Sequence, residues 1–449
     1  MKLYLESLGC ARNQVDSEIM AGRLINAGWT MVNDPQEADM IVVNTCSFIE
    51  SAVQESIDTI LELAEYKKEG SCNRLVVAGC LPERYREDIL NSLPEVDVFL
   101  GTGAFDQIVN AIQDPQFTNQ CLLPDPELIA LQNNESPRDL SLPHSAYLKV
   151  AEGCSKTCTY CIIPKLRGRQ KSRSPEDIVS EATRLIAKGV KELVLVAQDT
   201  TAYGKDLPTP VNLSQLIESL ANIKTENQQD LDPSWFRVLY GHPESIEASF
   251  IETVASYSNV CSYFDIPIQH VNTAILKRMG RQYSCNDLYR LFDRIRTHVP
   301  DAVLRTTILV GFPGETNKDF EELVQFAEDV RFDHLGVFIY SDSDDLPSHK
   351  FDDHVPIAQA RDRYHQLMSM QSEISSENNQ KYIGKIVKVL VEESLKNRIF
   401  AGRTTFQAPE VDGVSYINTE PSHFHLKIGC FTDMRVTDAM EYDLMGEAI

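Results

Sequence analysis

Segments typical of β-strands alternate with segments of helical pattern through most of this chain of 449 residues. In the first third, strand-like residues 1–10, 38–46 and 73–80 are separated by helical stretches that begin near Asp16 and Ser51. Strands that alternate with helices form a parallel sheet, because each helix carries the chain back to the edge where the next strand begins. We therefore predict an N-terminal α/β domain with a parallel sheet over residues 1–135.

The alternation resumes after a proline-rich linker at residues 114–143 and predicts a second domain over residues 144–375. Six or so strand–helix units, from "AYLKV" to "HLGVFIYS", suggest a complete or partial β/α barrel with its chemistry on the loops after the strands. Ser174, which precedes Pro175, is expected to cap a helix. Short strands punctuated by glycine then predict a small β-barrel over residues 380–449.

The composition is that of a globular chain, with 43% hydrophobic and 24% charged residues. No apolar run approaches the length of a membrane span, and the first residues lack the apolar core of a secretory signal. We therefore expect a cytoplasmic protein without a membrane partner. The formal net charge of −24 opposes general nucleic-acid binding and makes a basic protein the more natural partner. The alternative is that the charge only keeps the protein in solution.

Each of the three strand-like segments of the first domain ends in a cysteine: Cys10, Cys46 and Cys80. Ligands of open α/β sheets gather beyond the carboxyl ends of the strands, so these cysteines are expected to meet at one edge of the sheet. The alternative is three separate buried cysteines that act as small apolar residues. Clustered cysteines in a chain without an export signal are more typical of metal sites or catalysis than of disulfides.

A second set of three cysteines, Cys154, Cys158 and Cys161, follows the first strand of the predicted barrel in "EGCSKTCTYCIIP". A structural zinc site is closed by four protein ligands, so three cysteines do not complete one. An iron–sulfur cubane held by three thiolates leaves one of its four irons without a cysteine, free to bind another molecule. The three strand-end cysteines would likewise leave one iron of a cluster without a cysteine ligand. The sequence therefore predicts two such open clusters, with two different roles.

The C-x3-C-x2-C spacing, with Tyr160 between its last two cysteines, resembles the radical S-adenosylmethionine superfamily. The resemblance implies that the open iron chelates the amino and carboxylate groups of S-adenosylmethionine. It also implies that the reduced cluster cleaves the sulfonium to give a 5′-deoxyadenosyl radical. Such a radical is needed where an unactivated carbon–hydrogen bond has no acidity that a general base could exploit.

Four stretches narrow the resemblance: "SLGCARNQVDSE", "VVNTCSFIESA", "VVAGCLPERY" and "EGCSKTCTYCIIPKLRGRQKSRSPEDI". They resemble the methylthiotransferases, which combine an N-terminal cluster domain, a radical barrel and a C-terminal TRAM domain. The resemblance implies two 4Fe-4S clusters, an auxiliary cluster on Cys10, Cys46 and Cys80 that delivers sulfur, and the radical-generating cluster on the second set. It further implies two molecules of S-adenosylmethionine, one as radical source and one as methyl donor, and an electron donor such as a flavodoxin-like protein. The other five cysteines, which match no family ligand, are Cys72, Cys121, Cys261, Cys285 and Cys430.

Tyr160, beside the second set of cysteines, is a candidate for binding the cofactor, and further candidates lie in or after predicted strands. Gln198 and Asp199 could touch the ribose of the cofactor or the substrate, or could cap their own loop. Arg305 could meet the cofactor carboxylate, or form an ordinary salt bridge of the barrel. His270 is expected to be a hydrogen-bonded structural histidine rather than a catalytic one.

The chain's concentrated positive stretch begins directly after the second cysteine motif. It could stabilise thiolates and a cofactor carboxylate, or could form a solvated loop, and we expect a mixture of both. Its alternating basic residues are Lys165, Arg167, Arg169, Lys171 and Arg173.

Two branches of the family share this chemistry. One modifies the β-carbon of an aspartate in a small-subunit ribosomal protein near the decoding centre, number twelve of its series, and the other modifies an adenosine in transfer RNA. The run "SLGCARNQVDSE" resembles the first branch, whereas the second tends to carry Gly-Cys-Gln-Met-Asn. Residues 381–449 hold eight basic and ten acidic residues, which suits a basic ribosomal protein better than RNA phosphates.

Two observations stand apart from this prediction. The segment "YSDSDDLPSHKF", at residues 340–351, differs from the acidic-Gly-Thr-x-Ala run usual in the family. A zinc-stabilised RNA-binding or scaffold protein without catalysis is the alternative from another functional class, and it would be colourless and inert toward S-adenosylmethionine.

Overall fold

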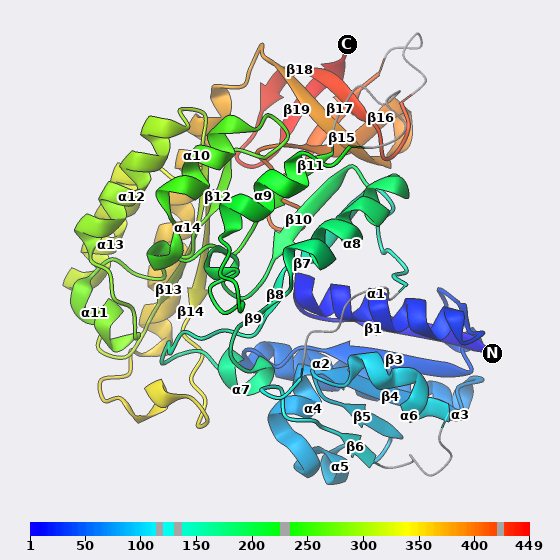
Figure 1. Cartoon of the computed structure of the whole chain (residues 1–449). Helices are drawn as coiled ribbons and strands as arrows, with labels where there is room; N and C mark the ends of the chain where they lie inside the picture. The colour runs from blue at the N-terminus through cyan, green and yellow to red at the C-terminus, as the bar shows by residue number, and fades with distance from the viewer. Residues whose placement is uncertain (114–119, 130–136, 225–233, 420–425) are drawn as a thin grey trace.

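The computed structural model describes residues 1–113, 120–129, 137–224, 234–419 and 426–449, in three successive parts of the chain (Figure 1). The first part is a six-stranded sheet of order β2-β1-β3-β4-β5-β6 in which every pair is parallel. Its strands are β1 (Lys2–Ser7), β2 (Thr30–Met31), β3 (Met40–Thr45), β4 (Arg74–Gly79), β5 (Val98–Leu100) and β6 (Gln120–Leu122). The predicted parallel α/β architecture is confirmed.

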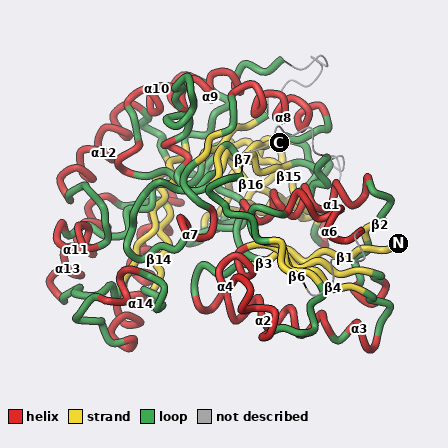
Figure 2. Tube along the Cα trace, turned by 60° about the horizontal axis from the view of Figure 1, so that its bottom comes forward, coloured by secondary structure: helices red, strands yellow, loops and turns green. Residues whose placement is uncertain are grey.

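Helices cover both faces of this sheet, as Figure 2 shows. One face packs on α1 (Ala11–Asn26) and α6 (Ile108–Gln113), and the other on α2 (Glu50–Ala64). Shorter helices are α3 (Tyr66–Glu69), α4 (Cys80–Tyr85) and α5 (Ile89–Ser92). Strand β3, "MIVVNT", is buried along its whole length, which is why it reads as a continuous apolar run rather than an alternating one.

The central part is a partial β/α barrel of two three-stranded parallel sheets, β11-β10-β7 and β12-β13-β14. The strands are β7 (Ser145–Lys149), β10 (Glu192–Val196), β11 (Trp235–Val238), β12 (Tyr263–Asp265), β13 (Val303–Val310) and β14 (His334–Ile339). Two short antiparallel strands, β8 (Ala151–Glu152) and β9 (Lys171–Ser172), flank helix α7 (Ile163–Arg167). Of the two sequence alternatives, the partial barrel is therefore the one observed.

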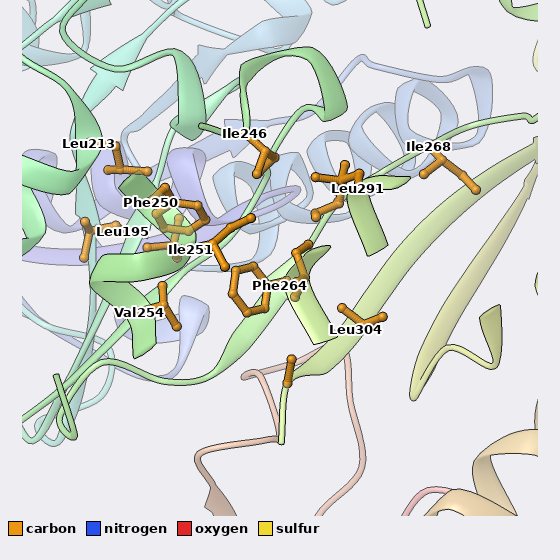
Figure 3. Close-up of a cluster of buried hydrophobic side chains, with 14 of the residues drawn as sticks. Leu195, Leu213, Ile246, Phe250, Ile251, Val254, Phe264, Ile268, Leu291 and Leu304 are labelled. Carbon is orange, nitrogen blue, oxygen red and sulfur yellow. The ribbon is translucent and has the colours of Figure 1, made fainter. Parts of the chain in front are cut away.

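The remaining helices of the central part lie outside the strands (Figure 1). They are α8 (Pro175–Ala187), α9 (Leu213–Ala221), α10 (Ala248–Ser256), α11 (Thr273–Arg278), α12 (Cys285–His298), α13 (Asn317–Val330) and α14 (Ile357–Gln380). Ser174 caps α8 as expected, by accepting a hydrogen bond from the backbone of Asp177 at 3.3 Å. Apolar side chains from strands and helices, such as Leu195, Phe250 and Phe264, meet in the core between them (Figure 3).

The C-terminal part is a closed barrel of order β15-β16-β17-β19-β18, which confirms the predicted small β-barrel. Its strands are β15 (Ile386–Ser394), β16 (Ile399–Thr404), β17 (Ser415–Asn418), β18 (Phe431–Ala439) and β19 (Leu444–Ala448). None of the helices in the described residues has both the length and the apolar character that a membrane span needs.

Buried charges join this barrel to the central part. Glu192, at the start of β10, is inaccessible to solvent and pairs with Arg237 at 2.8 Å and with Arg403 of β16 at 2.6 Å. Burial alone would raise the pKa of the Glu192 carboxyl, but the two guanidinium groups bring it down to about 2. The carboxylate is therefore ionised wherever the two domains are docked at ordinary pH.

The junction predicts a specific loss of stability in acid. A carboxyl whose pKa is lower in the folded state stabilises the fold above its unfolded pKa, about 4.5, and loses that contribution as the pH falls toward about 2. We expect E192Q to lower the free energy of unfolding at pH 7 by about 3–5 kcal/mol, because two buried arginines lose a counter-charge. The difference from the wild type should shrink below pH 4.5.

The measurement is urea unfolding between pH 3 and pH 7, in a W29F background. It follows the fluorescence of Trp235, whose ring lies 4.5 Å from that of Phe431 in β18. E247Q is the matched control, since Glu247 makes an exposed 3.5 Å pair with Lys205. A difference between E192Q and wild type that is constant with pH would contradict this account.

Candidate functional site

The carboxyl ends of three neighbouring strands bring the first set of cysteines together. Cys10 follows β1 and precedes α1, Cys46 comes directly after β3, and Cys80 directly after β4. The strands lie in the order β1-β3-β4, so the three residues meet at one edge of the sheet, as the sequence predicted. Gly9 has φ +94°, and a Cβ there would lie 2.8 Å from the Cβ of Cys46, so the close approach of these loops requires glycine.

Asn13 holds the three loops in place from inside the sheet edge. Its side-chain amide donates to the carbonyl of Leu8 at 3.0 Å and to that of Thr45 at 2.8 Å, on the loops that carry Cys10 and Cys46. Its Oδ1 lies 4.0 Å from the sulfurs of both Cys10 and Cys80. One buried side chain therefore touches all three cysteine loops.

The second set lies on the loop between β8 and α7 and lines the same cavity as the first. The backbone N–H of Cys154 donates to the carbonyl of Gly168 at 3.0 Å, and that of Thr159 donates to the carbonyl of Met279 at 3.1 Å, so the loop is tied near its start and in its middle. All six thiols are free of disulfides and line one cavity of about 320 Å³, within the range of small-molecule sites. The residues concerned are Cys10, Cys46, Cys80, Cys154, Cys158 and Cys161.

Arg167 connects the two sets. It comes from α7, directly after the second cysteine loop, and its guanidinium reaches the Cys80 sulfur at 3.8 Å and the Asn13 side chain at 2.5 Å. Its charge is balanced by Glu152 at 2.9 Å and Asp16 at 3.3 Å. The expected mixture within the basic stretch is observed, because Arg167 and Arg173 are buried whereas the Arg169 side chain is 81% exposed.

The electrostatics of the cavity differ between the cysteines. Burial raises the pKa of the Cys80 thiol and that of Cys161 to about 12. Burial also opposes ionisation of Cys10, but Arg12 and Arg167 bring its pKa below the ordinary value. Buried thiols of this kind become thiolates when a metal binds them, since a coordinated thiol is deprotonated.

The donor set fits iron–sulfur clusters better than single ions. Over the described residues, no three His, Cys, Asp or Glu side chains converge closely enough to hold one metal ion. The three thiolates of a cubane bind three different irons, so they are spread around the cluster and need not converge on a point. Two sets of three free cysteines that face one cavity meet this requirement.

The other sequence-predicted residues divide into two groups. Tyr160, Gln198 and Asp199 line the cavity, whereas Arg305 is not among the described residues that do. Arg305 instead pairs with Asp265 at 3.0 Å and with Asp412 of the C-terminal barrel at 3.6 Å. The salt-bridge alternative is therefore the one observed, because the arginine lies early in β13 whereas the cavity lies beyond the carboxyl ends of the strands.

Gln198 and Asp199 differ in how much of their hydrogen-bonding capacity is free. Asp199 accepts bonds from Thr201 at 2.9 Å and Ser245 at 3.1 Å, which is the loop-capping alternative. Gln198 donates to Glu152 at 2.7 Å, while its Oε1 is buried with no hydrogen-bond partner in the described structure. Gln198 is therefore the better placed of the two to bind a ligand.

His270 and the 340–351 segment have structural contacts. His270 is fully buried, its Nδ1 accepts backbone bonds from Val271 and Asn272 at 2.9 and 3.0 Å, and burial lowers its pKa to about 3. In the 340–351 segment, Asp345 pairs at 3.0 Å with Arg84 of α4, directly beyond Cys80. The segment thus ties the barrel to the N-terminal domain.

Sequence reasoning missed several polar residues of the cavity, which are Arg12, Lys156, His242, Gln269 and Arg281. Arg281 donates to the Tyr160 hydroxyl at 2.8 and 3.1 Å, and so fixes the aromatic residue between two of the cysteines. Burial lowers the pKa of His242 to about 2, so this imidazole is neutral. Arg12 and Lys156 adjoin cysteine motifs and could have been found from that position, whereas Arg281 and His242 have no such signal.

Three family profiles match the chain in sequence. "Uncharacterized protein family UPF0004" covers residues 2–101, "Radical SAM superfamily" covers 148–327, and "TRAM domain" covers 383–449. In structure, the radical S-adenosylmethionine methyltransferase TsrM from Kitasatospora setae, bound to tryptophan and aza-SAM, aligns with a TM-score of 0.55. The two share 13% identity over 75% of this chain and 72% of that one, a likeness that shows the fold alone.

Curated relatives match from end to end. "Ribosomal protein uS12 methylthiotransferase RimO" of Desulfosudis oleivorans is 51% identical over 100% of both chains. The protein of the same name from Clostridioides difficile is 47% identical over 100% of this chain and 99% of that one. The chain therefore belongs to the radical S-adenosylmethionine methylthiotransferases, in the RimO family.

Proposed function

We propose that this enzyme methylthiolates the β-carbon of an aspartate in ribosomal protein uS12, with sulfur delivered at an auxiliary iron–sulfur cluster. The observation that carries the proposal is the single cavity lined by two separate sets of three free cysteines. The relatives at 51% and 47% identity bear the name of uS12 as their substrate. An electron donor such as a flavodoxin-like protein belongs to the proposal, because a radical cluster must be reduced before it acts.

Each set of cysteines would hold one 4Fe-4S cluster. Cys154, Cys158 and Cys161 would hold the cluster that binds S-adenosylmethionine, with Gln198 beside it, and the strand-end cysteines would hold the auxiliary one. When bound, these groups supply the radical that removes hydrogen, the sulfur and the methyl group. The chain itself would provide three thiolate ligands for each cluster and a shared cavity that limits the access of solvent to a radical.

Protein residues also fix the position of the two cysteine sets relative to each other. Arg167, which follows the second cysteine loop in α7, contacts Asn13 and the sulfur of Cys80, and so links the two sets of cysteines directly. Arg281 orients Tyr160 against the second cysteine loop through its hydroxyl. These contacts would keep the cluster that generates the radical and the cluster that delivers sulfur in the same cavity.

The first prediction concerns the substrate. Deleting the gene should remove one methylthio group from an aspartate of uS12, and the mass of the intact ribosomal protein measures this directly. Nucleosides from digested transfer RNA of the same cells provide the comparison, because the sister branch of the family modifies adenosine. Loss of the modification from adenosine, with uS12 unchanged, would contradict the assignment to uS12.

The second prediction concerns the clusters. The variant C10A/C46A/C80A should bind about half the iron of the wild type after anaerobic reconstitution, because one of two four-iron clusters is lost. It should still cleave S-adenosylmethionine to 5′-deoxyadenosine, whereas methylthio transfer should disappear. The matched control is C72A/C121A/C285A, three cysteines away from the cavity, which should retain all the iron. Full iron in the first variant would rule out an auxiliary cluster on these cysteines.

The third prediction concerns docking by the C-terminal barrel. We propose that its acidic surface attracts basic uS12, so D438K/E441K should weaken binding and reduce its dependence on salt. Both residues are exposed, as are Glu321 and Glu328 on α13, and E321K/E328K provides an equal change of charge elsewhere. Calorimetry at several salt concentrations measures the affinities. Equal weakening by both variants would show that only net charge matters.

A further inference from the structure

We propose that Arg12 binds the side-chain carboxylate of the substrate aspartate and so selects a carboxylate-bearing substrate at this cavity. The proposal deepens the function proposed above and rests on it. Arg12 is the second residue of α1, two positions after Cys10, and it lines the cavity with the six cysteines. It therefore stands beside the set of cysteines from which sulfur would be delivered.

The structure holds Arg12 in place without using all of its donors. Its NH1 donates to the carbonyl of Ala197 at 3.1 Å, and its guanidinium lies 4.5 Å from the ring centroid of Tyr240. Both contacts come from the central barrel, so the arginine reaches across from the N-terminal domain. Its Nε is buried and has no hydrogen-bond partner in the described structure. Since a guanidinium carries five N–H donors, several remain for a ligand.

The other cations of the cavity are already engaged. Lys156 pairs with Glu244 at 2.6 Å, and Arg167 pairs with Asp16 and Glu152. The three nitrogens of Arg281 donate to two tyrosine hydroxyls and the carbonyl of Pro267. Within the part of the chain that the structure describes, Arg12 is the cavity cation that has neither a carboxylate partner nor a full set of acceptors.

A substrate aspartate needs such a partner. A carboxylate that enters a buried cavity loses its hydration, and this loss is severe unless a cation with matching hydrogen-bond geometry replaces the water. The β-carbon is bonded directly to the carboxylate carbon, so a carboxylate held by Arg12 also places the reacting carbon near Cys10. Adenosine, by contrast, has no carboxylate for this arginine to bind.

The test measures affinity for two forms of uS12 by four forms of the reconstituted enzyme. The uS12 forms carry either the target aspartate or asparagine in its place, and the enzymes are wild type, R12M, R12K and R169M. R12M keeps the length of the side chain but removes its charge, and R12K keeps the charge but loses the planar fork. R169M alters an exposed arginine in the loop between α7 and β9. Iron content and the electron paramagnetic resonance spectrum of each enzyme are recorded in parallel.

We expect R12M to bind the aspartate form on the order of tenfold to a hundredfold more weakly, the range for a hydrogen bond to a charged group, and the asparagine form nearly as the wild type does. R12K should be intermediate, R169M unchanged, and the cluster signals of all four alike. If R12M lost affinity equally for both uS12 forms, the pairing of Arg12 with the aspartate would be overturned. The same would follow if R12M lost its cluster signals while the ratio of its affinities for the aspartate and asparagine forms stayed that of the wild type. Either result would leave the proposed function standing. A wild-type enzyme that binds neither form would overturn the proposed function, and the pairing with it.

Discussion

Four charged side chains, largely buried where the N-terminal sheet meets the central barrel, join the two parts of the chain whose cysteines line one cavity. Asp16 of α1 pairs with Lys149 at 2.5 Å and Arg167 at 3.3 Å, and Glu152 pairs with the same two cations at 2.8 and 2.9 Å. Burial would raise the pKa of the Glu152 carboxyl, but Arg167 and Lys149 hold it well below its usual range. Removing one member would leave an uncompensated buried charge, which costs about 3–5 kcal/mol, so these pairs oppose separation of the two parts.

That geometry explains why the cavity lies between domains rather than within one. Parallel sheets place their reactive ends at the carboxyl edge, and here two such edges, one from an open sheet and one from a partial barrel, face each other. Asn13 and Arg167 extend the charged junction as far as the thiols. The contacts that join the two domains therefore also position the cysteines. A displacement at the domain junction would displace the cysteine loops as well.

Buried salt bridges also attach the C-terminal barrel, at the opposite end of the central strands. Glu192, Arg237 and Arg403 tie it to the start of β10, which is the end of the central strands away from the cavity. Arg305 belongs to this side, through Asp265 and Asp412. The position of Arg305 inside a predicted strand indicated a polar contact. Whether that contact lies at the cavity or at the C-terminal barrel depended on how the C-terminal barrel packs against the central part.

The sequence by itself determined the order of the elements and the cysteine positions, because strand and helix periodicity and the spacing of ligands are local properties. Cys10, Cys46 and Cys80 could be predicted to converge, since parallel strands share a carboxyl edge. Only the tertiary structure decided what surrounds them. Arg12, His242 and Arg281 reach the cavity from segments far apart in the chain, and their roles depend on which donors remain unpaired after folding. The local sequence pattern does not predict which donors are paired, because the pairing arises only when the domains pack against each other.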